Sequence, residues 1–133
     1  MTSEELQERV NKAAETVEKK MATIERHKKQ LVKKAQPLEG WIDLNRYNDY
    51  RYNMELRDRY TMELRDRYKS ETGRDLYWDI WDYSNKLSDI RGAEDSLKEA
   101  KRILTSWNVK LDAQLEKERT IEKVLPPIFN QLK

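Results

Sequence analysis

The sequence contains no cysteine, one histidine, three glycines and three prolines. Without cysteine the chain has no disulfide bonds and no thiolate chemistry, which suits the reducing cytoplasm where we expect the protein to act. So few turn-forming residues among 133 positions also disfavour a fold built from many short strands. This scarcity of glycine and proline favours long, uninterrupted helices.

Long hydrophobic runs are missing as well. Residues 1–30 lack the apolar stretch of a signal peptide, and no segment approaches the roughly 18 apolar residues of a membrane span. The 27 basic and 25 acidic residues give a net charge of +2, which provides no general attraction to nucleic acid or to lipid. We therefore expect no membrane association.

Residue types that support catalysis or metal binding are scarce. No Ser–His–acid arrangement and no glycine-rich phosphate loop occurs, and His27 has no second histidine to form a metal site with. Asp75, Asp79 and Asp82 lie near an expected helix start, where the first compensates the helix dipole and the others face solvent or arginine. The sequence thus predicts a non-enzymatic protein without cofactor or metal.

What the chain does have is charge, with 39% charged and 37% hydrophobic residues, a composition typical of long helices around a thin core. Val10, Val17, Ile24 and Leu31 recur every seven residues, which is coiled-coil spacing. This pattern predicts a helix over residues 3–35, with Ser3 as its N-cap and Pro37 and Gly40 after its end.

Residues 36–52 have no sustained period and predict a loop, which Trp41, Ile42 and Leu44 anchor to the helices. The segment 53–68, NMELRDRYTMELRDRY, repeats an octapeptide with one exchange. Its tyrosines and leucines alternate at intervals of four, which predicts a helix over residues 53–70 that ends at a Gly73 C-cap. Because eight residues rotate the second copy by about 80°, the repeat favours scaffold over a two-site binding motif.

A long helix is expected over residues 74–124, followed by a tail over 125–133, because Pro126 and Pro127 end the helix. Within this helix Gly92 is expected to permit close approach of a neighbouring backbone. The apolar positions follow a spacing of three and four, and they are Leu87, Ile90, Ala93, Leu97, Ala100, Leu104, Trp107, Leu111, Leu115 and Ile121.

These elements predict one all-α domain over residues 1–133. Its fold class is an elongated antiparallel helical hairpin, coiled-coil-like, with a shorter third helix at an aromatic-rich end. The matched lengths pair residues 3–35 with residues 90–124, and residues 74–89 with the shorter helix. A parallel homodimer through the heptads of residues 3–35 is the competing arrangement.

The aromatic-rich segment, residues 41–83, holds ten of the twelve aromatic residues, interleaved with arginine. Tyr, Trp and Arg are enriched at protein-binding hot spots, although core packing explains the same residues. Its net charge of −2 disfavours phosphate capture. The residues expected to bind a protein partner are Trp41, Tyr47, Tyr50, Tyr52, Arg57, Tyr60, Arg65 and Tyr68.

Residues 19–34 form the one basic block, with seven Lys or Arg and a single acid, Glu25. A solvated helix face is the simplest interpretation. The alternative is a nucleic-acid-binding face, whose residues would be Lys19, Lys20, Arg26, Lys29 and Lys33.

The run LYWDIWDYSNKLSDIRGAEDSLKEAKRILTSWNVKLDAQLEKE, residues 76–118, resembles small charged helical accessory proteins of bacterial phages, plasmids and conjugative elements. The resemblance implies binding to a host defence protein, as anti-CRISPR inhibitors bind nuclease or ribonucleoprotein complexes. We therefore expect a protein-binding module that inhibits such a host nuclease complex. The alternatives are a nucleic-acid-binding accessory protein and a self-associating structural coiled coil.

Overall fold

The first helix, α1, spans Ser3–Ala35, as the heptad pattern predicts. The computed structural model describes residues 1–44 and 62–132, with side chains through residue 122. The expected cap at Ser3 is wrong, because the hydroxyl of Thr2 accepts a hydrogen bond of 3.2 Å from the Glu5 amide. Thr2 is therefore the N-cap, and it satisfies an amide that has no partner within the helix.

The end of α1 is set by a short 3-10 helix, η1, over Gln36–Leu38, which has proline in its first turn. Gly40 follows with φ 81°, a backbone conformation that glycine adopts without strain. The chain then folds back, so that Ile42 is buried and Trp41 and Leu44 pack against the same cluster. The prediction that these three residues anchor the loop is confirmed.

Helix α3 spans Met62–Thr72. It ends two residues later than expected, and the first copy of the octapeptide, together with residues 45–52 of the loop, lies outside the described residues. The expected C-cap is confirmed, because Gly73 has φ 74° and its amide donates a hydrogen bond of 2.8 Å to the Lys69 carbonyl. This bond is the αL cap, which needs a residue that tolerates positive φ.

Helix α4 spans Leu76–Leu132 and begins at an Asp75 cap. The expectation that it ends before Pro126 is wrong, and residues 125–132 continue the helix instead of forming a separate tail. A proline inside a helix removes one hydrogen bond and crowds the carbonyl four residues earlier, at a cost of about 3 kcal/mol, but its φ of about −65° lies within the helical range.

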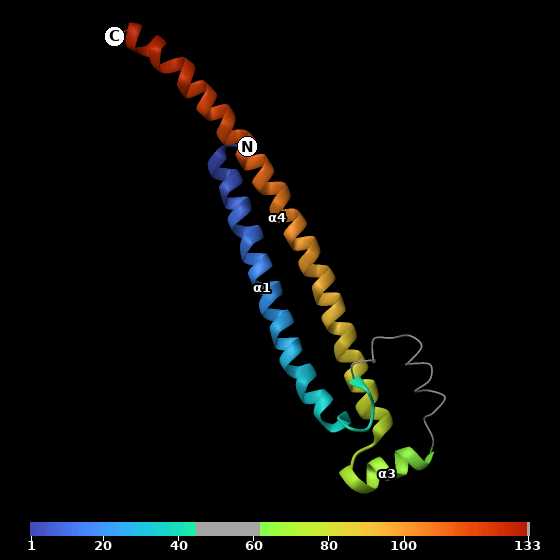
Figure 1. The fold of residues 1–133 in the computed structure, drawn as a ribbon. Helices are drawn as coiled ribbons and strands as arrows, with labels where there is room; N and C mark the ends of the chain where they lie inside the picture. The colour runs from blue at the N-terminus through green and yellow to red at the C-terminus, as the bar shows by residue number, and fades with distance from the viewer. Residues whose placement is uncertain (45–61, 133) are drawn as a thin grey trace. The chain divides into compact units, whose positions relative to one another are not determined.

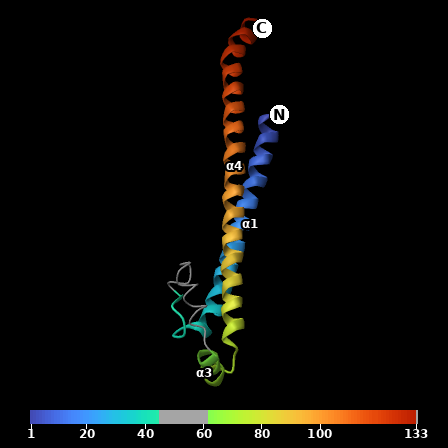
Figure 2. The same ribbon diagram turned by 90° about the vertical axis from the view of Figure 1, so that its right-hand side faces the viewer.

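The chain divides into two compact units, residues 24–92 (unit 2) and residues 1–23 with 93–133 (unit 1). The core of unit 2 comprises Leu38, Ile42, Tyr68, Leu76 and Tyr83, which come from η1, the segment after it, α3 and α4, and α1 packs against this core through Leu31 and Ala35. Figures 1 and 2 show α3 beside the start of α4. Tyr68 is the residue of α3 that belongs to this core.

Within unit 2, α1 and α4 run antiparallel. Lys86 donates a hydrogen bond of 2.8 Å to Gln30, and one turn further along α1, Lys34 lies 3.8 Å from Asp82. The end of α1 thus lies beside Asp82. The prediction that residues 3–35 pair with a segment of the long helix starting at residue 90 is therefore wrong. The reason is that the α1 terminus packs onto the core formed by Leu38, Leu76 and Tyr83 at the start of α4.

Within unit 1, α1 and α4 are also antiparallel, and the Arg9 guanidinium lies 5.7 Å from the centre of the Trp107 ring. Leu6, Ala100 and Leu111 are buried here, in agreement with the expected apolar seam. Leu115 and Ile121, however, are 39% and 53% exposed. The seam fails there because α4 continues past the first residues of α1, which therefore cannot cover it (Figure 1).

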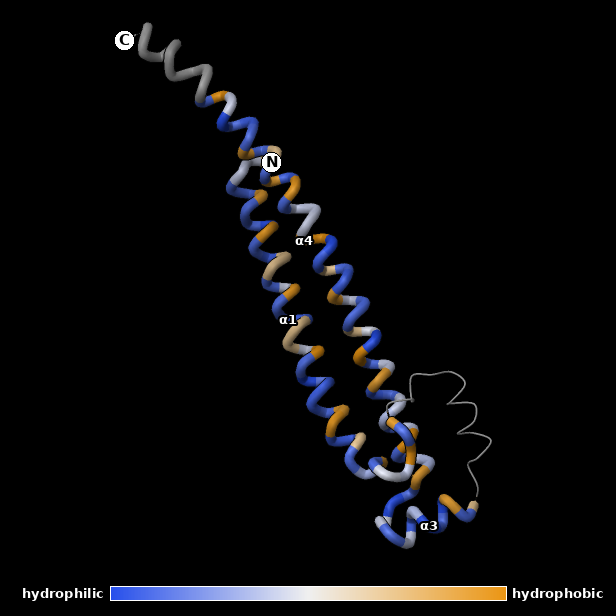
Figure 3. Tube along the Cα trace, viewed as in Figure 1, coloured by the Kyte–Doolittle hydropathy of each residue, from blue (hydrophilic) through white to orange (hydrophobic). Residues whose placement is uncertain are grey.

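The fold is thus all-α, an antiparallel helical hairpin, and no strand occurs among residues 1–44 and 62–132. Figure 3 shows hydrophilic residues over most of both long helices, with hydrophobic positions recurring between them. At Gly92, the last residue of unit 2, no atom of the described residues apart from the chain neighbours and the backbone of its own helix lies within 4 Å of where a Cβ would be. The expected close approach of another backbone at Gly92 is therefore wrong.

Candidate functional site

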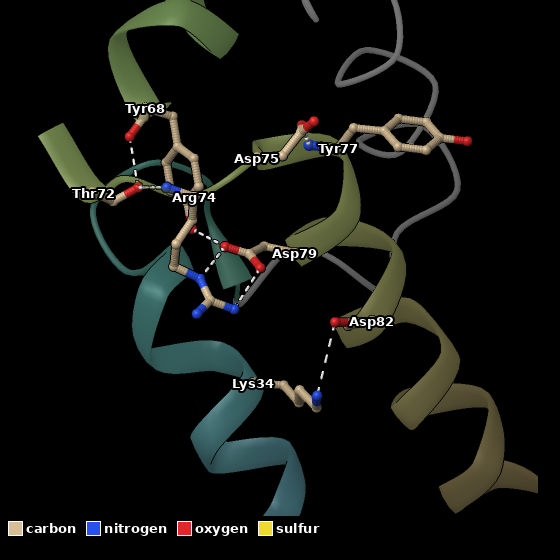
Figure 4. A network of polar contacts seen from close by, with 8 residues as sticks. All are labelled: Lys34, Tyr68, Thr72, Arg74, Asp75, Tyr77, Asp79 and Asp82. Carbon is tan, nitrogen blue, oxygen red and sulfur yellow. Dashed lines mark hydrogen bonds and ion pairs between the residues drawn. The ribbon is translucent and has the colours of Figure 1, made fainter. Parts of the chain in front are cut away.

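The junction of α3 and α4 is held by a buried hydrogen-bond network. The Tyr68 hydroxyl donates to one oxygen of Asp79 at 2.5 Å, and Arg74 donates from Nε and Nη2 to the two oxygens at 2.7 and 2.8 Å (Figure 4). Asp79 is the only buried charged residue in the described part of unit 2, at 6% exposure. Burying a carboxylate is tolerated here because both oxygens are satisfied.

Ionisation follows from this arrangement. The hydrogen bonds from Arg74 hold the pKa of Asp79 below its ordinary value of 3.8, burial opposes the shift, and the Tyr68 hydrogen bond adds to it. Burial and the adjacent Asp79 raise the pKa of Tyr68, and Asp79 raises the pKa of Arg74. The network therefore stays as an ion pair with a neutral phenol, and it provides no group that exchanges protons near neutral pH.

A second pair fixes the same junction. Arg65 of α3 donates to both oxygens of Asp75 at 3.1 and 2.6 Å, and Asp75 in turn caps α4 by accepting from the Tyr77 amide at 3.0 Å. These contacts lower the pKa of Asp75, with the Arg65 hydrogen bonds as the largest cause. The Arg65–Asp75 pair and the Tyr68–Asp79 hydrogen bond thus join α3 to the start of α4, and the Arg74–Asp79 pair fixes the connecting segment to the first turn of α4.

The outer face of this first part of α4 carries an aromatic patch, which consists of Tyr77, Trp78 and Trp81. Their exposed fractions are 47%, 55% and 49%. Neighbouring rings meet edge to face, with centroids 5.1 Å apart for Tyr77 and Trp78 and 5.9 Å apart for the two tryptophans.

The position of the patch follows from helical geometry. Trp78 follows the buried Leu76 by two residues and Trp81 precedes the buried Tyr83 by two, and each such step turns about 200° around an α-helix. The rings therefore lie on the side of α4 opposite to the core. A helical wheel drawn from the sequence could have found this face, because it needs only the assignment of Leu76 and Tyr83 to the core.

Three of the eight residues expected to bind a partner lie in the described part of the chain. Tyr68 is fully buried, so its ring is not available to a partner, and the prediction of a surface anchor is wrong there. The ridge of tyrosine and leucine packs inward, because Tyr68 meets Trp41 at a ring distance of 5.1 Å and Asp79 needs its hydroxyl. Arg65 forms an ion pair with Asp75, and Trp41 is half-buried against the core beneath Arg67.

The other five residues expected to bind a partner lie outside the described residues, and they are Tyr47, Tyr50, Tyr52, Arg57 and Tyr60.

The expected basic face lies along α1, where Lys20 is partly buried and the other four residues are exposed. Lys19 and Lys20 belong to unit 1, whereas Arg26, Lys29 and Lys33 belong to unit 2. The last three form no ion pair with any described residue. The face therefore remains a candidate for contact with phosphates.

Over residues 1–44 and 62–132, no helix combines the length and apolar character needed to cross a membrane. No three His, Asp or Glu side chains in the described segments lie together as metal ligands would. Comparisons with protein-family models, with curated proteins and with solved structures yield no match to this chain. The geometry of the α3–α4 junction and of the aromatic patch is therefore the basis for assigning a function.

Proposed function

We propose that this chain is a non-enzymatic protein-binding module and that the aromatic patch is its contact surface. The observation that supports this most directly is the exposure of Trp78 and Trp81, 55% and 49%, on the face of α4 that points away from the core. Tryptophan is the residue type most enriched at binding hot spots, and exposed apolar clusters mark interaction sites.

Energetics favour covering these rings. A buried aromatic side chain removes 150–250 Å² from water, so covering the exposed halves of both tryptophans is worth about 4–6 kcal/mol at roughly 25 cal/mol per Å². The patch is also held in place, because Asp75 and Asp79 of the same two turns are fixed by arginine. A preorganised surface loses less conformational entropy on binding.

The spacing of the rings indicates the mode of contact. On α4, Trp78 and Trp81 are three residues apart and Tyr77 and Trp81 are four apart, which are spacings that the anchors of a helix entering an apolar groove also use. We therefore expect a partner with such a groove. The resemblance of residues 76–118 to proteins of mobile elements makes a host defence nuclease complex, such as a CRISPR effector, the first partner to test.

The test compares the wild-type chain with a Trp78→Ala, Trp81→Ala double variant in pull-downs from host cells, followed by affinity measurement with the purified partner. The matched control is Ile103→Ala with Val109→Ala, two residues of unit 1 that are 39% and 63% exposed. We expect the double variant to lose at least about a hundredfold in affinity and the control to keep wild-type binding. Equal binding by all three proteins would contradict the proposal.

A nucleic-acid-binding function is the second candidate, because Arg26, Lys29 and Lys33 are exposed and lack an ion pair among the described residues. Salt separates the two functions. Phosphate contacts give a steep loss of affinity as salt is raised, whereas an aromatic contact is insensitive to it. Self-association through α1 or the patch is a third outcome, which sedimentation at several concentrations would detect as a change of mass.

A further inference from the structure

Unit 2 contains a cavity of about 450 Å³ between the end of α1 and the start of α4. This volume lies within the range of about 300–1,000 Å³ that small-molecule sites occupy. Its lining comes from α1, η1, the α3–α4 connection and α4, and it consists of Gln30, Lys33, Lys34, Pro37, Arg74, Asp79, Asp82 and Lys86. Four of these residues are cations and two are carboxylates, so the lining carries an excess of positive charge.

The charge of Asp79 is not available to a ligand. Its side chain is 7% exposed, and both oxygens are bound by Arg74 and Tyr68. Arg74 itself is 54% exposed and uses Nε and Nη2 on Asp79, which leaves the two N–H groups of Nη1 for another acceptor. This guanidinium can therefore donate to an anion without releasing its carboxylate partner.

The lysines are only weakly compensated. Lys34 lies 3.8 Å from Asp82, beyond hydrogen-bond distance, and the two side chains are 45% and 41% exposed. Lys33 has no ion pair among the described residues. Lys86 is 17% exposed and donates to the neutral amide of Gln30 at 2.8 Å, while Asp89 lies 3.6 Å away. Figure 4 shows Lys34, Arg74 and Asp82 arranged around the same space.

We propose that this cavity binds the phosphate group of a small phosphorylated molecule. A phosphate monoester carries two negative charges and three acceptor oxygens. The two negative charges equal the excess of positive charge in the lining, which has four cations and two carboxylates. The phosphate oxygens can accept hydrogen bonds from Arg74, Lys33 and Lys34. A single carboxylate would leave part of this charge uncompensated. The remaining volume accommodates the organic group that carries the phosphate.

The experiment is a calorimetric titration of the full chain with inorganic phosphate and with ribose 5-phosphate, using ribose as the uncharged control. We expect one saturable site for ribose 5-phosphate in competition with phosphate, and no binding of ribose. The Lys33→Gln, Lys34→Gln double variant should weaken binding at least about tenfold. The matched control is Lys29→Gln, an exposed lysine of the same helix that does not line the cavity, and it should change affinity less than about twofold.

Two results would overturn the proposal. One is the absence of saturable binding at millimolar phosphate or ribose 5-phosphate by wild-type protein that circular dichroism shows to be helical. The other is an equal loss in the Lys29→Gln control, above all if a single-stranded oligonucleotide binds more tightly than ribose 5-phosphate. That result would assign the lysines to an extended nucleic-acid surface. Neither outcome depends on the aromatic patch.

Discussion

Tyr68 donates a hydrogen bond from its hydroxyl to Asp79, although the two residues belong to different helices and the tyrosine side chain is fully buried. The same carboxylate binds Arg74, which lies in the connection between α3 and α4. One buried acid therefore determines how the end of α3 meets the start of α4. The stability of unit 2 should therefore depend on both residues that bind Asp79, Tyr68 and Arg74.

Replacing Tyr68 by phenylalanine should lower the free energy of unfolding by about 1–2 kcal/mol, because the ring keeps its packing while Asp79 loses a donor in a buried position. Urea denaturation followed by circular dichroism measures the change. Asp82→Asn is the control, since this carboxylate is 41% exposed and its ion pair with Lys34 at 3.8 Å lies at the surface, where such pairs add little stability. An equal effect of both substitutions would show that the buried hydrogen bond adds no stability of its own.

Acid should weaken unit 2 through Asp79. Its pKa in the folded protein lies below the ordinary 3.8, so the folded state binds fewer protons than the unfolded state as pH falls. The stability that Asp79 provides is thus fully present above about pH 5 and is lost as pH falls through the folded pKa. Unfolding free energies of wild type and Asp79→Asn should differ most near neutral pH and converge in acid. A constant difference at every pH would contradict this.

Gly92→Ala should stabilise the protein by about 0.5–1 kcal/mol, because glycine is a poor helix former and no described residue beyond its own helix backbone and chain neighbours comes within 4 Å of the added methyl group. The opposite result is expected at Gly73, where φ is 74° and alanine is strained. Melting temperatures of the two variants, measured together, provide the test. Destabilisation by Gly92→Ala would indicate that this position of α4 is not helical in solution.

Thr2 and Ser3 are adjacent, but only Thr2 caps α1, so the two residues should differ in their effect on stability. Thr2→Ala should cost about 0.5–2 kcal/mol, because it removes the acceptor of the Glu5 amide. Ser3→Ala should be close to neutral, since Ser3 is the first residue inside the helix. Helix content by circular dichroism and the midpoint of urea unfolding measure both. A larger effect at Ser3 than at Thr2 would return the cap to the position that the sequence pattern first suggested.

Local patterns in the sequence determined the helices. The seven-residue period and Pro37 define α1 as Ser3–Ala35, and Gly73 ends α3 because only a residue that tolerates positive φ can form that cap. Each of these features depends on residues a few positions apart. Propensity, periodicity and capping act over that range, so they can be interpreted without knowing what packs against the helix.

Contacts between residues far apart in the sequence decided which aromatic side chains are buried and which are exposed. A ridge of tyrosine and leucine shows that one face is apolar, but burial of Tyr68 depends on Trp41 and Asp79, which reach it from other segments. Likewise, Trp78 and Trp81 fit a core as well as a surface until Leu76 and Tyr83 occupy the core side of α4. The sequence by itself determined the extent of α1, the end of α3 at Gly73 and which residues are apolar. Only tertiary packing decided which rings face inward, because burial depends on a partner element that local periodicity does not specify.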